Sequence, residues 1–199
     1  MLILVTSEKI WPDEHTLLKE ILVSDLVLHV RKPGISDSEL SNWLELFEAE
    51  QTTKMVLHQH HQMAEKFPVK GIHLTESNRM KLGDSLTEYV QSAKEKHLAV
   101  STSFHDKDSL KQYSIFDYCF LSPIYKSVSK AGYSGKNFQV NDLHQKVIAL
   151  GGITSDKFRS IKKAGFSGGA VLGAVWETSN PIAAFQKIQQ AYKLNFNKK

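Results

Sequence analysis

Cysteine, long apolar runs and one-sided charge are all scarce in this chain of 199 residues. Its one cysteine, Cys119, excludes an internal disulfide and fits a reducing compartment. The first apolar run, residues 2–5, is too short for a signal peptide or a membrane span, so we expect a cytoplasmic protein that does not bind membranes. The net charge of +4 is dispersed, and no basic run is interleaved with aromatic residues, which argues against nucleic acid as a partner.

What the chain does have is a series of short apolar segments that alternate with helical patterns. We expect strands at residues 2–6, 25–31, 54–58, 71–74, 98–101, 118–124, 147–150 and 169–175. Helices are expected at residues 14–22, after a cap at Ser36, at 82–96, 108–113, after Thr154 and from Pro181, and the tail 195–199 is expected to fray.

Continuous apolar strands separated by helices indicate a parallel sheet whose outer face is covered. Eight such units fit a single compact (β/α)8 TIM barrel over residues 1–199. A doubly wound open sheet is the alternative, although it needs only about five or six strands.

In a barrel of this kind the chemistry lies at the carboxyl ends of the strands. Cations, hydroxyls and glycines follow several of the expected strands, which is what a phosphate or diphosphate site needs. Gly151 and Gly152 end the seventh strand, where bare backbone can approach an anion beside the next helix. A tight turn with close helix packing explains the same pair of glycines.

Five segments carry a resemblance: HVRK at residues 29–32, GIHLTES at 71–77, LAVSTS at 98–103, LSPIYKSVSK at 121–130 and ALGGIT at 149–154. In this order they resemble motifs of the thiamine-phosphate synthase family, which includes the TenI-type thiazole tautomerases. The synthases join an aminopyrimidine diphosphate to a thiazole phosphate and release pyrophosphate with magnesium.

The resemblance implies a set of binding residues. The positions that match the family's pyrophosphate site are Arg31, Ser101, Ser127, Ser129 and Lys130, and those that match its thiazole phosphate site are Gly151, Gly152 and the backbone near Gly173.

The departures from the family pattern concern the metal positions and the ends of two strands. Gln59 and Asn78 stand where the family has its magnesium carboxylates, and two neutral amides should bind Mg²⁺ weakly. His29 replaces a glutamine and His58 an asparagine, and both are kept as candidate substrate-binding residues. We therefore expect no cofactor, with magnesium needed only if the chain is a working synthase.

Histidines supply the remaining candidates. His58, His60 and His61, with His73 on the next strand, could bind Zn, Ni or Cu, but no Cys or acidic residue has ligand spacing, and contact with ligand or solvent is the simpler interpretation. His105 lies near the position of the tautomerases' catalytic histidine, whereas a gap-free register places Ser103 there. With Lys130, these two are the candidate catalytic residues, and an ordinary exposed loop histidine is the alternative for His105.

Three functions remain open at this point: a TenI-like thiazole tautomerase, a working synthase with a rearranged set of cations, and a phosphate-binding barrel without catalysis that has a regulatory role. The expected partners are a thiazole phosphate and, for the synthase, a pyrimidine diphosphate. A homo-oligomer is left open.

Overall fold

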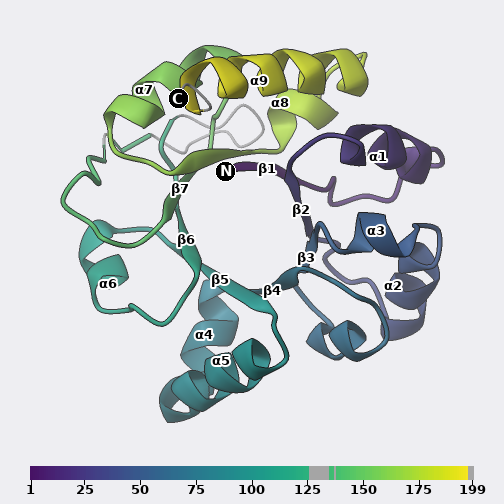
Figure 1. Cartoon of the computed structure of the whole chain (residues 1–199), viewed down its shortest axis with the longest axis horizontal. Helices are drawn as coiled ribbons and strands as arrows, with labels where there is room; N and C mark the ends of the chain where they lie inside the picture. Colours follow the sequence, from purple (N-terminus) through teal and green to yellow (C-terminus); the bar gives the residue numbers. More distant parts are fainter. Residues whose placement is uncertain (126–134, 137, 197–199) are drawn as a thin grey trace.

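Eight parallel strands form a closed ring at the centre of the computed structural model, and the helices lie outside it (Figure 1). The structure describes residues 1–125, 135–136 and 138–196. The strands are β1 (Leu2–Val5), β2 (Val27–Val30), β3 (Met55–Leu57), β4 (Gly71–Leu74), β5 (Ala99–Phe104), β6 (Tyr118–Leu121), β7 (Val147–Leu150) and β8 (Gly168–Val171).

Closure of the ring is visible in the strand pairing. Each strand pairs with the next in the chain, and β1 also pairs with β8, where Leu2 lies opposite Gly169 and Leu4 opposite Val171. A doubly wound sheet would have two edge strands, each paired on one side only. Every strand here has a partner on both sides, which confirms the (β/α)8 barrel and excludes the open sheet.

The helices cover the outside of the barrel. They are α1 (Glu14–Leu22), α2 (Asp37–Leu44), α3 (Ala49–Thr52), α4 (Glu76–Leu82), α5 (Leu86–Glu95), α6 (Lys107–Lys111), α7 (Phe158–Lys163), α8 (Gly173–Trp176) and α9 (Pro181–Phe196), with 3₁₀ turns η1 (His61–Glu65), η2 (Gly83–Ser85) and η3 (Ser155–Lys157). Among the described residues, no helix has both the length and the apolar character needed to cross a bilayer.

Local sequence explains how α2 begins and packs. The Ser36 hydroxyl accepts a hydrogen bond from the Glu39 N–H, and the Glu39 carboxylate accepts one from the Ser36 N–H, which forms a capping box. Leu40, Trp43 and Leu44 then fall on one face and are buried. The cap at Ser36 is confirmed.

Successive side chains of a strand point to opposite faces, so each strand contributes to two cores. One core lies between the strands and the helices and contains Cys119, which is fully buried as expected of a core thiol, with its pKa raised by burial to about 12. The other fills the inside of the barrel and contains Ile3, Val56, Phe120 and Ile148. The same alternation points several polar side chains into the barrel near the carboxyl ends of the strands.

Several of the expected boundaries differ from the structure, three of them for a reason that the structure shows. The eighth strand was expected to reach Val175, but it ends at Val171, because Leu172 leaves the extended conformation (φ −138°, ψ −84°) and α8 follows. The helix expected at 82–96 begins only at Leu86 as α5, because Leu82 ends the preceding helix α4 and Gly83, whose φ is +48°, begins the turn η2 between them. The tail was expected to fray from Asn195, yet α9 continues to Phe196, which stacks on Tyr192.

Candidate functional site

A cavity of about 420 Å³ opens at the carboxyl ends of the strands. Its wall combines apolar side chains such as Phe120, Leu150 and Leu172 with polar groups from six of the eight strand ends. The polar lining includes several of the residues singled out from the sequence, namely Arg31, His58, Ser103, His105, Gly151, Gly152 and Gly173. His29 and Ser101 lie beneath this wall, and Ser127, Ser129 and Lys130 are outside the described residues.

The two glycines after β7 are required by their backbone conformation. Gly151 has φ +95° and Gly152 has φ +64°, both in the left-handed region. A Cβ on Gly151 would lie 3.0 Å from Pro123 Cα, so Pro123 would have to shift to make room for a side chain there. Gly173 lies at the end of the neighbouring strand β8, where an added Cβ would lie 3.1 Å from the carboxylate of Glu177. Backbone rather than side chains therefore forms this part of the cavity.

Two carboxylates at the cavity mouth are each placed beside cations. Glu8 pairs with Arg31. Glu76 lies 3.6 Å from the Arg79 guanidinium and 3.8 Å from His105 Nε2. Because both carboxylates have cationic neighbours, the mouth carries balanced charge and is not an acidic site.

Arg79 is a residue that sequence reasoning missed. It is buried, its Nη1 donates to Thr102 Oγ1 at 2.8 Å and to the Ser103 carbonyl at 2.6 Å, and its guanidinium lies 4.0 Å from the centre of the Phe104 ring. These bonds fix the end of β5, and with it the position of Ser103. An arginine in an ordinary helical stretch carries no sequence signal for this role.

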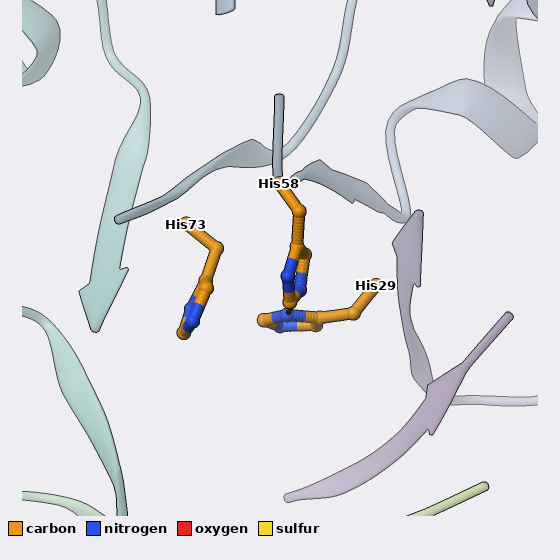
Figure 2. A group of neighbouring side chains, drawn as sticks. All are labelled: His29, His58 and His73. Atoms are coloured by element: carbon orange, nitrogen blue, oxygen red, sulfur yellow. Dashed lines mark hydrogen bonds between the residues drawn. The ribbon is translucent and has the colours of Figure 1, made fainter. Parts of the chain in front are cut away.

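Three histidines, His29, His58 and His73, lie together inside the barrel and are called the barrel histidines below (Figure 2). His29 Nδ1 is 2.9 Å from His58 Nε2, and the His58 and His73 rings stack with their centres 4.2 Å apart. All three are buried, and burial lowers each pKa, that of His73 to about 3. They are therefore neutral imidazoles at physiological pH.

His105 occupies the rim of the same cavity. Its Nδ1 is 3.1 Å from the Ser122 carbonyl, so this nitrogen carries the hydrogen in the neutral ring, and Nε2 is the nitrogen left to exchange a proton. Ser103 also lines the cavity, with its hydroxyl 3.0 Å from His73 Nε2. The two positions between which the sequence could not choose thus both face the cavity.

Comparison with known proteins decides the family. A family model described as thiamine monophosphate synthase matches residues 2–175. The chain belongs to this family. A thiamine phosphate pyrophosphorylase from Bacteroides thetaiotaomicron is 28% identical, with a TM-score of 0.71 over 97% of this chain and 96% of that one.

More distant structures share the fold alone. A thiamine phosphate pyrophosphorylase from Pyrococcus furiosus is 16% identical, with a TM-score of 0.71 over 97% of this chain and 95% of that one. A 3-hexulose-6-phosphate synthase from Salmonella typhimurium is 13% identical, with a TM-score of 0.68 over 98% of this chain and 100% of that one. No curated protein matches the chain. Membership of the thiamine monophosphate synthase family places the chain in thiamine biosynthesis, among proteins that bind thiazole phosphate and pyrimidine substrates.

The family's magnesium positions do not fit the ion in this chain. Gln59 and Asn78 line a second cleft beside Tyr89 rather than the main cavity, and the Gln59 amide donates to the Lys32 carbonyl. Neutral amides in this arrangement lack the charge that Mg²⁺ prefers in its oxygen ligands. Glu8 and Glu76 are the carboxylates on the described wall of the main cavity, and both lie beside cations.

Two neighbouring polar groups have structural roles. Lys32 follows Arg31 at the same strand end, but it is buried under α1, where Nζ lies 2.6 Å from both carboxylate oxygens of Glu14. His60 and His61 lie along the second cleft, where His60 bonds to the Ile35 carbonyl and His61 to the Tyr89 hydroxyl. The described histidine cluster therefore contains His29 in place of these two.

Proposed function

We propose that the chain is an isomerase of a thiazole phosphate, of the TenI type within its family. The observation that carries this proposal is the nature of the two magnesium positions, because Gln59 and Asn78 are amides turned to a separate cleft. A proton shift within one bound ring needs acid–base groups, which the main cavity has, and needs no diphosphate-neutralising ion.

The cavity suits a small ring that carries one phosphate. Its walls are largely apolar at Phe120, Leu150 and Leu172, as a neutral heteroaromatic ring requires. The turn at Gly151 and Gly152 offers backbone at the place where the family resemblance implies the phosphate. His105 and Ser103 are the two candidates from the sequence for handling the proton, and both line the same space.

A second candidate is a working synthase. It is favoured by the 28% identity with the thiamine phosphate pyrophosphorylase from Bacteroides thetaiotaomicron over nearly the whole chain. In this case Arg31 and cations of the loop after β6 would offset the charge of a diphosphate substrate, and Glu76 would be the nearest carboxylate to an ion.

Both reactions can be assayed with one preparation of the purified chain. We expect isomerisation of a thiazole phosphate, followed by NMR, to proceed at the same rate with and without a chelator. Coupling of a pyrimidine diphosphate to the thiazole phosphate should be slow or absent even with excess Mg²⁺. Rapid coupling that a chelator abolishes would refute the isomerase in favour of the synthase, and failure of both reactions with intact ligand binding would favour a regulatory barrel.

A further inference from the structure

Among the described residues, the barrel histidines are a group of side chains with the composition and spacing of a metal site. One ring nitrogen of each histidine lies within 4.8 Å of those of the other two. His29 lies on β2, His58 directly follows β3 and His73 lies on β4, so three adjacent strands supply the group. Figure 2 shows that the three side chains point toward one another. The group is therefore assembled by strand pairing and not by a local motif.

His29 has the hydrogen-bonding environment of a metal ligand. A neutral imidazole has one N–H and one nitrogen with a lone pair. His29 Nε2 is 2.7 Å from the Tyr118 hydroxyl, and a hydrogen donated there leaves the lone pair on Nδ1, which faces His58 Nε2 at 2.9 Å. Histidines that bind metals commonly donate their other ring hydrogen to a polar group behind them in this way.

His73 is held by hydroxyl groups on both sides. Its Nδ1 is 2.9 Å from Ser101 Oγ, and its Nε2 is 3.0 Å from Ser103 Oγ. The Ser101 hydroxyl donates to the Ile72 carbonyl, so its oxygen accepts the hydrogen of His73 Nδ1. The lone pair of the ring then lies on Nε2, on the same side as Ser103, which lines the main cavity.

His58 is the ring that is least constrained. Its Nδ1 is buried and has no hydrogen-bond partner among the described residues. A buried polar nitrogen without a partner costs free energy unless a ligand, a water or an ion satisfies it. Rotation of this ring about χ2, a torsion with a broad distribution in histidine, breaks only its bond to His29.

One ring must turn before all three can bind the same ion. Bonds of about 2.0–2.1 Å at tetrahedral angles place ligand nitrogens about 3.3–3.4 Å apart, close to the 2.9 Å between His29 and His58. The His58 and His73 rings stack at an interplanar angle of 25°, and parallel rings do not direct their lone pairs at one point. His29 is inclined to the two rings by 79° and 68°, so His58 is the ring that must rotate.

The donor atoms select the kind of ion. Imidazole nitrogens suit Zn²⁺, Ni²⁺ and Cu²⁺, whereas Mg²⁺ and Ca²⁺ require oxygen ligands. Three histidines leave one position of a tetrahedral zinc site open. His58 and His73 both line the main cavity, so an ion reaches the rings from the cavity and a water there completes its coordination.

We propose that the barrel histidines bind one late first-row divalent metal ion, Zn²⁺ being the best fit, beside the main cavity. This site differs from the family's magnesium positions, which are amides at the second cleft. The proposal goes beyond the isomerase function, since the candidates for proton transfer, His105 and Ser103, are not ligands of the ion. Its test needs no substrate, so its failure leaves the proposed function untouched.

The probe is Zn²⁺ alone, added to purified chain that has been treated with a chelator. We expect calorimetric titration to show one ion bound per chain, and the same titration with Mg²⁺ to show no binding. Since an ion that binds only the folded chain stabilises it, Zn²⁺ at a hundred times Kd should raise the thermal midpoint by about 5–10 °C.

Substitution of a ligand tests the assignment of the site. His73→Gln should weaken Zn²⁺ binding at least about 100-fold, because even the outer partners of metal ligands contribute about 10–100-fold. His144→Gln is the matched control, since His144 is exposed and distant from the cluster in sequence, and its affinity should equal that of the wild type. His60→Gln is a second control, because His60 pairs with Asp37 and lies at the second cleft.

Four outcomes overturn the proposal. They are a wild type that does not bind Zn²⁺, binding to His73→Gln with unchanged affinity, binding that is lost in His60→Gln, which would place the ion at the second cleft, and binding through exposed histidines only.

Nitrogen-15 NMR of the unsubstituted chain decides the question if His73→Gln misfolds. Addition of Zn²⁺ should shift the ring resonances of all three barrel histidines together and leave that of His144 in place. Shifts confined to other histidines identify an adventitious surface ion and contradict the site.

Discussion

Replacement of Lys32 by methionine tests the buried ion pair under α1 most directly. Lys32 Nζ donates to both carboxylate oxygens of Glu14 and to the carbonyls of Ser7 and Lys9, at 2.6–3.0 Å, and both side chains are at most 2% exposed. Lys32→Met leaves the carboxylate buried without its cation. Loss of one partner of a buried pair costs about 3–5 kcal/mol, which is the expected fall in the free energy of unfolding.

The double variant Lys32→Met with Glu14→Leu separates the two causes of that loss. It removes the unpaired charge and leaves only the two backbone carbonyls without their donor, at about 0.5–1.5 kcal/mol each. We therefore expect the double variant to be less stable than the wild type by about 1–3 kcal/mol, and more stable than the single variant. Lys66→Met is the control, since its pair with Glu45 is exposed and should contribute little.

The pH dependence of the free energy of unfolding, measured by urea unfolding, tests the same ion pair in a second way. Burial raises the pKa of Glu14, and loss of Lys32 removes the cation that opposes this rise. A carboxyl group whose pKa is higher in the folded than in the unfolded state lowers the free energy of unfolding, and this effect is complete above the folded-state pKa. The effect disappears below the unfolded-state pKa, where the group is protonated in both states. The gap between the single and double variants should therefore narrow as the pH falls toward 4.5, the ordinary value for the group. Equal stability of the two variants at neutral pH would refute the reasoning.

Three further predictions concern the barrel mouth and its histidines. Gly151→Ala should lower the thermal midpoint more than Gly34→Ala, since both glycines have positive φ but only Gly151 would bring a Cβ within 4 Å of another residue, at Pro123; equal shifts would contradict the close contact. Gly152→Asp should abolish binding of a thiazole phosphate in calorimetry, and unchanged affinity would remove the phosphate from this turn. Burial lowers the pKa of His73 from its ordinary value of 6.5 to about 3, so His73 takes up a proton on unfolding when the pH is below about 6.5. The free energy of unfolding therefore decreases as the pH falls below 6.5. His73→Gln should remove about 2 kcal/mol of the loss between pH 6.5 and 5 in urea unfolding, whereas an unchanged pH dependence would mean that His73 is not held neutral.

The fold could be predicted from the sequence because its signals are local. Apolar strands such as residues 71–74 and 147–150 have the length of buried strands, and helical patterns separate them, so a parallel sheet closed into a barrel is the simplest way to bury all eight. The cavity wall followed from the same reasoning. Arg31, His58 and Gly151 come directly after strands, and the carboxyl ends of parallel strands meet at one face.

Tertiary structure alone decided how side chains that are distant in the chain meet. Lys32 and Arg31 are both cations that directly follow the strand β2, and the sequence does not distinguish them. In the structure Lys32 lies beneath α1, where it is buried against Glu14. His29 and His58 become hydrogen-bonding neighbours through the register between β2 and β3, which no local sequence pattern specifies. Periodicity fixes which face of a strand a residue occupies, but the shear of the barrel fixes which residue lies beside it.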